Sequence, residues 1–233
     1  VGTGINTVTH FKDFSLLQSS STEWLGFDRC ARPLSKDFPS HLGSMTDPSQ
    51  ITYYTKTGFN NDWNVKTFRP LPDLKLNLTW NRKIGDKVGT ILTFGYSNAN
   101  KTIPDMQNTR YGIYSATADV PTIEKNYIDN QFTNEVKINA MNNWSFILDS
   151  RNRFEFRNLF SQIGKNRFTE RYGTSTVSGE YYENQTEMLY SSRLSYVGQL
   201  AGLHTLDEDM TQTLNWTVDY SYANKMEPDR RII

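Results

Sequence analysis

The chain has 233 residues, of which 36% are hydrophobic and 13% aromatic, and its 25 basic and 25 acidic side chains give a net charge of zero. A zero net charge excludes the long-range attraction to nucleic acid that a basic domain has. The many aromatic residues exclude a disordered chain, which needs few aromatics and a high net charge. Few aliphatic and many aromatic side chains suit strands that are apolar on one face only.

The first residues alternate as if a strand had been entered midway. Val1, Thr3, Ile5 and Thr7 alternate with glycine or asparagine. These opening residues contain neither the basic region nor the apolar region of a signal peptide. No run reaches the ~18 apolar residues of a membrane helix. Because the strands of a membrane β-barrel carry a much weaker signal, neither observation excludes a membrane protein.

Period-two alternation is the clearest signal along the rest of the chain. The alternating stretches cover residues 74–81, 88–97, 134–146, 153–164, 188–203 and 213–223. Tight turns separate them in pairs, at 85–86, 149–152 and 207–209. With the opening residues, they predict about seven antiparallel strands. We expect one apolar, lipid-facing surface that is formed by Leu74, Leu76, Leu78, Trp80, Leu92, Phe94, Ile138, Trp144, Phe156, Leu194, Trp216, Val218 and Tyr220.

The connections between these strands alternate between short and long. The tight turns have a few residues each, whereas the connections across 15–72, 98–131 and 172–186 are predicted to be long loops. Short turns at one end and long loops at the other are typical of outer-membrane barrels. Trp80 and Trp144 each lie five residues before a turn, where aromatic side chains mark a membrane interface. No helical period is present, and we predict no helix.

A soluble antiparallel sandwich is the alternative, because such sheets also bury one face. Three features favour an up-and-down transmembrane β-barrel. Large aromatics lie near the ends of the apolar faces, charges and amides lie in mid-strand on the opposite faces, and several tracts exceed the usual ~5–6 residues of a strand. Bacterial barrels have an even number of strands, so seven predict part of a larger barrel. We therefore expect a curved sheet with open edges.

Specific segments resemble one protein family. They follow one another along nearly the whole chain: FKDFSLLQSSSTEWLGFD at 11–28, FNNDW at 59–63, NTRYGIYSATAD at 108–119, RFEFRNLFSQIG at 153–164, LYSSRLSYVGQLAGLHTL at 189–206 and LNWTVDYSYANKMEPDRR at 214–231. These segments resemble TonB-dependent outer-membrane receptors of the Bacteroidota. The branch of this family that the segments resemble carries an N-terminal carboxypeptidase-like regulatory domain ahead of a plug domain.

The resemblance implies a 22-stranded barrel with a plug inside it, of which residues 1–233 would form the first part, without the plug and the regulatory domain. Such receptors import scarce nutrients across the outer membrane of Gram-negative bacteria. A TonB–ExbB–ExbD complex in the inner membrane supplies the energy, and it would couple through the missing N-terminal part. Some relatives are capped by a surface lipoprotein. The expected partners are therefore this complex, outer-membrane lipid and such a lipoprotein.

The residues that often carry chemistry form no recognisable centre. His10, His41 and His204 are far apart in sequence and have no partner at metal-ligand spacing. Cys30 is the single cysteine, so it forms no disulfide within the chain, and no activating base is suggested beside it. Sequences such as HExxH, GxSxG and a glycine-rich phosphate loop are absent. We expect no enzyme activity, no metal and no cofactor.

Two groups of residues have both a structural and a functional interpretation. Mid-strand charges are expected to face a lumen, either to bind a plug and water or to line a permeation path: Lys137, Glu155, Arg157, Arg193 and Asp219. Loop aromatics either pack loops together or contact a ligand: Tyr53, Tyr54, Trp63, Tyr111 and Tyr114. The structural interpretation is favoured for both groups. The alternative functions are a TonB-independent structural or secretion-complex barrel and a soluble secreted β-sandwich that binds carbohydrate.

Overall fold

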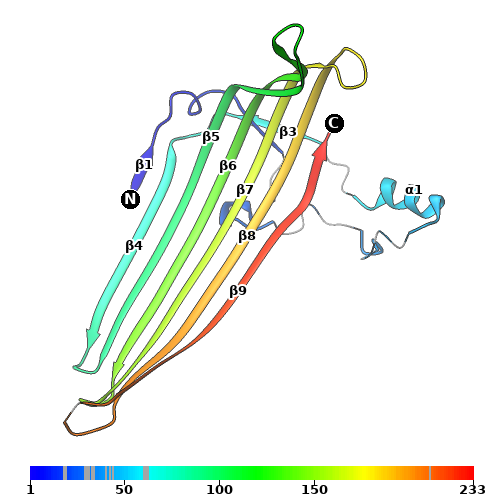
Figure 1. Ribbon diagram of the computed structural model, residues 1–233. Coiled ribbons are helices and arrows are strands. Elements are labelled where there is room, and N and C mark those ends of the chain that lie inside the picture. The colour runs from blue at the N-terminus through cyan, green and yellow to red at the C-terminus, as the bar shows by residue number, and fades with distance from the viewer. Residues whose placement is uncertain are drawn as a thin grey trace.

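The computed structural model describes residues 1–17, 20–28, 32, 35–39, 41, 43, 45–59, 63–209 and 211–233, so that Cys30 and residues 60–62 lie outside the described residues. Most of the described chain forms one antiparallel sheet in the order β1-β4-β5-β6-β7-β8-β9 (Figure 1). The strands of this sheet are β1 (Gly2–Gly4), β4 (Asp73–Ile84), β5 (Val88–Ser115), β6 (Val120–Ile147), β7 (Asn152–Ser175), β8 (Tyr181–Thr205) and β9 (Thr213–Ile232).

The sheet is a seven-stranded meander with two edges. β1 lies at one edge and β9 at the other, and no pairing joins them within the described residues. The predicted antiparallel sheet with open edges is therefore confirmed. The strands are unusually long. β5 and β6 have 28 residues each, which corresponds to roughly 90 Å at the usual rise along a strand.

The three tight turns lie together at one end of the sheet (Figure 1). Gly85, between β4 and β5, has φ 61°, a left-handed conformation that glycine adopts without strain. In the next turn, the Asp149 side chain accepts hydrogen bonds from Asn152 and from the backbone N–H of Arg151. These bonds, first the one from the Asn152 side chain, hold the pKa of Asp149 below its ordinary value. The predicted turns are confirmed.

Two of the three predicted long loops are wrong. β5 continues to Ser115 and β6 begins at Val120, while β7 continues to Ser175 and β8 begins at Tyr181. Most of 98–131 and 172–186 is therefore strand. Pro104 does not end β5, because it lies at a bulge between Ile103 and Met106, where a missing N–H is tolerated. The long partner strands satisfy the backbone of this polar sequence, and this pairing outweighs its weak strand propensity.

The connection across 15–72 is long, as predicted, but it has structure of its own. It contains a two-stranded sheet of β2 (Phe14–Leu17) and β3 (Val65–Phe68), a 3-10 helix η1 (Glu23–Leu25) and a helix α1 (Pro48–Thr57). α1 stands away from the large sheet (Figure 1). No helix of the described residues is long and apolar enough to cross a membrane.

The prediction that the chain has no helix is wrong because of α1. The helix begins with Asp47 as its N-cap, whose carboxylate accepts a bond from the backbone of Ser49 at 2.9 Å, and with Pro48 in its first turn. Both are standard start signals. No residue of α1 is buried, so the sequence has no apolar face from which a helical period could be recognised.

A hydrophobic core forms where β2 and η1 pack on the large sheet, against β6 and β7. Its buried residues are Phe14, Leu16, Leu17, Phe168 and Met188, with Phe68 and Phe132 packed against them. The Phe14 ring lies 5.5 Å from both the Phe68 and the Phe132 rings in edge-to-face contacts, an arrangement that aromatic pairs prefer. The N-terminal part of the chain is thereby fixed to the half of the sheet farther from the short turns.

Candidate functional site

The two faces of the large sheet follow from its register. Residues that lie directly opposite each other in an antiparallel pair point to the same face. Leu76 pairs with Tyr96, Tyr96 with Ile138, Ile138 with Gln162, and Gln162 with Leu194. Even numbers pair with even numbers in each case. Between the short turns and the first bulges, the even-numbered residues of β4–β9 form one surface, the even face, and the odd-numbered residues form the odd face.

The even face brings together every side chain that the sequence predicts for the apolar surface, because all of them have even numbers on paired strands. Many are uncovered: Leu78, Val218 and Tyr220 have exposed fractions of 67%, 63% and 64%. Soluble monomers rarely expose contiguous apolar patches above a few hundred Å². This apolar surface, the band, therefore has the character of a contact surface.

The height of the band is limited along each strand. On β6 it runs from Ile138 to Phe146 and on β9 from Leu214 to Tyr222, each about nine residues, close to the ~9–11 that a tilted strand needs to cross a bilayer. Ile138, with an exposed fraction of 9%, lies at the far limit. The band therefore has the length of a membrane crossing, although the strands are much longer.

Aromatic rings mark the two ends of the band. Near the short turns, Trp144 stacks on Phe146 with ring centres 6.1 Å apart, and Phe154 and Trp216 lie 6.0 Å apart. Trp216 also donates a hydrogen bond from its indole N–H to His204 Nε2 at 3.0 Å. Because Nε2 accepts this bond, the neutral His204 ring carries its proton on Nδ1 and donates to Asn152 Oδ1, 2.7 Å away.

Tyrosines lie farther along the strands. The rings of Tyr196 and Tyr220 are 6.2 Å apart, and the Tyr196 hydroxyl donates to Asn158 Oδ1 at 2.6 Å. Asn158, a polar residue on the even face, also donates from Nδ2 to the Asn142 carbonyl at 3.2 Å. Polar groups within an apolar surface need such partners.

Beyond the band, a segment from the N-terminal part of the chain covers the even face. We call its described residues, 14–17, 20–28 and 32, the strap. Gln162 donates from Nε2 to the carbonyl of Gly26. Asn166 donates from Nδ2 to the Leu17 carbonyl at 3.2 Å and to Glu23 Oε2 at 3.1 Å. Gln162 and Asn166 have exposed fractions of 1% and 2%. Polar residues on the even face thus occur where the strap provides partners.

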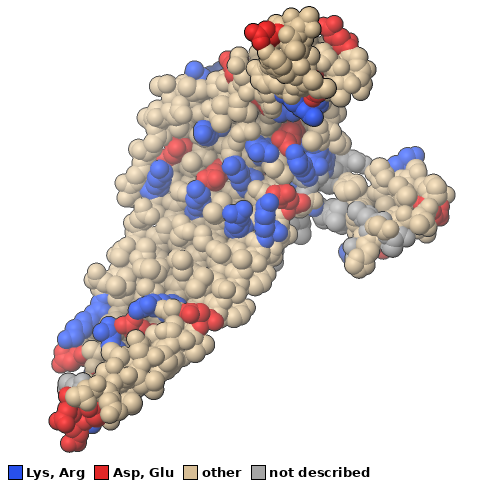
Figure 2. All heavy atoms as spheres, in the orientation of Figure 1, with Lys and Arg blue, Asp and Glu red and all other residues tan. Residues whose placement is uncertain are grey.

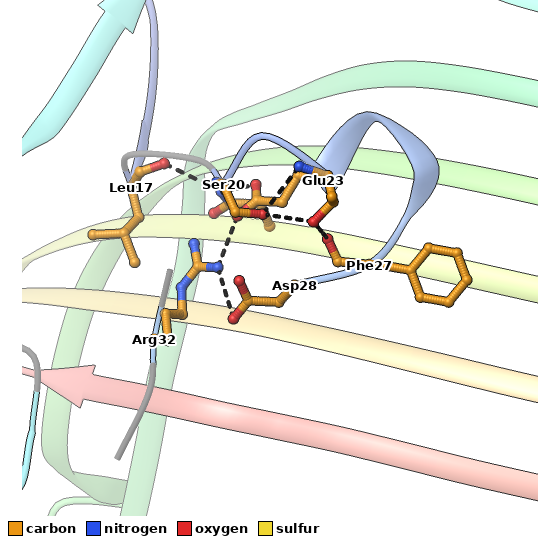
Figure 3. A network of polar contacts seen from close by, with 8 residues as sticks. Leu17, Ser20, Glu23, Phe27, Asp28 and Arg32 are labelled. Atoms are coloured by element: carbon orange, nitrogen blue, oxygen red, sulfur yellow. Dashed lines mark hydrogen bonds and ion pairs between the residues drawn. The ribbon is translucent and has the colours of Figure 1, made fainter. Parts of the chain in front are cut away.

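A buried ion network holds the strap together (Figure 3). The Arg32 guanidinium donates from Nη1 to Glu23 at 2.7 Å and lies 3.3 Å from Asp28. All three side chains are nearly inaccessible, with exposed fractions of 2%, 8% and 5%. The guanidinium also lies 4.6 Å from the centre of the Tyr190 ring on β8. Because a buried charge without its partner is costly, the ion pairs hold the strap in one conformation, and the contacts with Asn166 and Tyr190 join it to the sheet.

The backbone of the strap approaches the sheet at Gly26 and Gly164. A Cβ atom at Gly164 would lie 2.5 Å from Gly26 Cα, and one at Gly26, which has φ 78°, would lie 3.0 Å from the backbone nitrogen of Gly164. Neither backbone atom can move as a flexible side chain would. Both positions therefore require glycine for the strap to dock.

We predict that Gly164→Ala displaces the strap. Overpacking of this kind costs about 1–3 kcal/mol, and here the clash is with backbone. Hydrogen exchange measured by mass spectrometry should show faster exchange in peptides that cover residues 14–28. Gly89→Ala is the matched control, because a Cβ there meets nothing within 4 Å. Unchanged exchange in Gly164→Ala would contradict this docking mode.

The odd face carries the charges that the sequence assigns to mid-strand, namely Lys137, Glu155, Arg157, Arg193 and Asp219. Figure 2 shows this face: Lys and Arg gather with Asp and Glu over the upper half of the sheet, and a second group lies near the short turns. In the second group, Glu155 pairs with Arg153 at 2.7 Å and with Arg157. The odd face is thus the charged one, although Leu159 and Val197, which pair with each other on it, are exposed apolar residues.

The aromatic ligand candidates are not brought together. Tyr53 and Tyr54 lie on α1 with their rings 5.3 Å apart, whereas Trp63 lies under the Arg231 guanidinium, 4.5 Å from it. The prediction that Tyr111 and Tyr114 are loop residues is wrong: both belong to β5 near its hairpin tip, because β5 extends to Ser115. Within the described residues these side chains form no common site.

The strap is the feature that the sequence patterns missed. Its partners on the sheet left a signal, because Gln162, Gly164 and Asn166 interrupt the apolar alternation of β7. Such an interruption indicates a place where the face meets protein. Elsewhere in the described residues, no three His, Cys, Asp or Glu side chains gather as metal ligands would.

The site is thus a surface with an exposed apolar band, a strap beyond it and a charged opposite face. No family model matches the sequence, and neither the curated proteins nor the solved structures include a match to it.

Proposed function

We propose that this chain forms part of the wall of a TonB-dependent β-barrel that imports a nutrient across the outer membrane of a Gram-negative bacterium. The observation that carries the proposal is the exposed apolar band of the even face, about nine residues high, with aromatic rings at both ends. Outer-membrane barrels present such a band to lipid and a polar surface to the lumen. In this arrangement the even face meets lipid and the odd face lines the interior.

The strap agrees with this arrangement. β5 to β8 have 24–28 residues each, more than twice the ~9–11 needed to cross a bilayer, so their far ends project from the membrane. There the even face carries Gln162 and Asn166, which could not face lipid without partners. The strap supplies these partners, and it lies outside the barrel above the lipid.

The TonB-dependent part of the proposal rests on the segments that resemble such receptors. It adds a larger barrel of 22 strands, a plug, coupling to the TonB–ExbB–ExbD complex and a surface lipoprotein as a candidate partner. A TonB-independent structural or secretion barrel shares the same band and is the second candidate. Dependence on the proton-motive force separates the two, because a passive barrel does not accumulate solute.

Uptake by whole cells tests the energy coupling. Cells with and without the gene are given labelled iron chelates and labelled oligosaccharides as probes, in the presence and absence of an uncoupler. We expect the gene to be required for accumulation of one probe, and the uncoupler to abolish that accumulation. Gene-dependent entry that continues with the uncoupler would favour the TonB-independent barrel.

We predict that the short turns face the periplasm and the opposite end faces the medium, because short turns in these barrels are periplasmic. Trypsin added to intact cells should cut after Lys56, near the end of α1, and spare Lys87 in the turn after β4. Permeabilised cells are the control, in which Lys87 should become cleavable. Cleavage after Lys87 in sealed cells would reverse the orientation.

A further inference from the structure

A basic hollow lies on the odd face, in the half of the sheet that is farther from the short turns. It has a volume of about 240 Å³ and is lined by Glu135, Lys137, Ile163, Lys165, Ser191, Ser192, Arg193 and Lys225. These residues come from β6, β7, β8 and β9, and the register places Lys137, Ile163, Arg193 and Lys225 side by side across the four strands. The hollow therefore gathers three cations at one level, and Lys165 adds a fourth two residues farther along β7.

The positive charge of the hollow is only partly neutralised. Lys137 pairs with Glu135 at 2.6 Å, and Lys225 pairs with Glu227 at 2.6 Å. Lys165 and Arg193 have no ion pair or hydrogen bond from their side chains to any part of the chain that the structure describes. Arg193 also lies directly opposite Lys225, and like charges in this relation are destabilising. An anion between them would remove this repulsion.

Other cations of the odd face differ in this respect. Arg171 binds Asp129 through two hydrogen bonds of 2.7 and 2.8 Å. Arg167 and Arg230 share Glu187, at 3.2 and 2.8 Å. A carboxylate of the chain thus neutralises each of these arginines, whereas Arg193 and Lys165 in the hollow have no such carboxylate partner within the described residues.

The strand pairing is also irregular beside the hollow. The β8–β9 register shifts between Tyr190 and Ser192, which leaves Ser191 without a directly paired residue on β9. The β6–β7 and β7–β8 pairings run without any shift. Bulges often re-aim side chains beside functional sites. Here the bulge adjoins the hydroxyl and the cations that line the hollow.

We propose that the basic hollow binds the oxyanion group, a carboxylate, sulfate or phosphate, of a small acidic solute. Arg193 offers the planar fork that matches an oxyanion, and Lys165 and Lys225 add point charges around it. The volume of the hollow is below the ~300–1,000 Å³ of pockets that enclose whole drug-sized ligands, so it suits the charged group of a solute. The inference of anion binding depends only on the residues of the hollow. The idea that the hollow lies on an import route rests on the proposed function.

Equilibrium dialysis of the full protein in detergent tests the inference, with labelled sulfate, phosphate and glucuronate as anionic probes and glucose as the neutral one. We expect saturable binding of the anions and none of glucose. Arg193→Gln and Lys165→Gln should each weaken binding about tenfold, as the loss of one charged hydrogen bond does. Arg193→Lys, which keeps the charge, should restore part of it.

Lys83→Gln is the matched control, because it removes one positive charge from the same face at the short-turn end. It should leave anion affinity unchanged. The inference is overturned if the wild-type protein binds none of the anions, or if the variants at Arg193 and Lys165 bind as the control does. Both results are independent of the uptake assay, so the hollow and the transport proposal can fail separately.

Discussion

In the proposed outer-membrane barrel, Leu200→Arg and Val218→Arg will each sharply reduce the amount of assembled protein. The two residues are paired across β8 and β9 in the middle of the band, and Val218 is 63% exposed. An arginine that faces lipid near the bilayer centre costs about 2–4 kcal/mol, a large share of the ~5–15 kcal/mol that stabilises a typical fold. Heat-modifiable migration of outer-membrane fractions on gels measures the assembled protein.

The neighbouring residues Ala201 and Thr217 provide the control. They pair with each other on the odd face, where Ala201 also lies opposite Glu155. Ala201→Arg and Thr217→Arg add the same charge to a surface that already carries charges, so assembly should stay near the wild-type level. If these variants fail and Leu200→Arg and Val218→Arg assemble normally, then the faces have been assigned the wrong way round.

The second large effect concerns solubility in water. Expressed without detergent, residues 1–233 should aggregate and not form a monomer. β9, from Thr213 to Ile232, has no partner on its outer side within the described residues, and long unpaired edges promote association. The exposed band adds an apolar surface that soluble monomers do not tolerate.

Size-exclusion chromatography with light scattering measures the outcome, with and without detergent. Detergent should yield a dispersed particle because it covers the band. A soluble monomer in plain buffer that unfolds cooperatively would remove the basis for a membrane barrel. It would leave the secreted β-sandwich as the better description of the chain.

Alternation predicted the half of the sheet that lies near the short turns. In 213–223, the residues Leu214, Trp216 and Val218 alternate with polar neighbours, and β9 covers this stretch with the expected faces. One apolar and one polar surface impose a period of two on the sequence. The tight turns were equally recognisable, since Gly85 and Asp149 are residue types with specific turn chemistry.

The far half could not be predicted in the same way. Between Thr109 and Ser115 on β5, the alternation fades and exposed polar and aromatic residues follow one another. Their strand conformation comes from the partner β6, which no local pattern contains. The strap had the same difficulty, because its contact between Gly26 and Gln162 joins residues that are 136 positions apart.

The position of the strap in the chain also determines the order in which the protein is built. Glu23 and Arg32 come before β4, yet the groups that receive them, Asn166 and Tyr190, belong to β7 and β8. The strap has no surface on which to dock until these later strands have paired. Until then Glu23 and Arg32 can pair with each other within the strap, but they stay exposed to water because the surface that buries them has not yet formed. Docking of the strap is therefore a late step of assembly, because it requires β7 and β8 to be paired in the correct register.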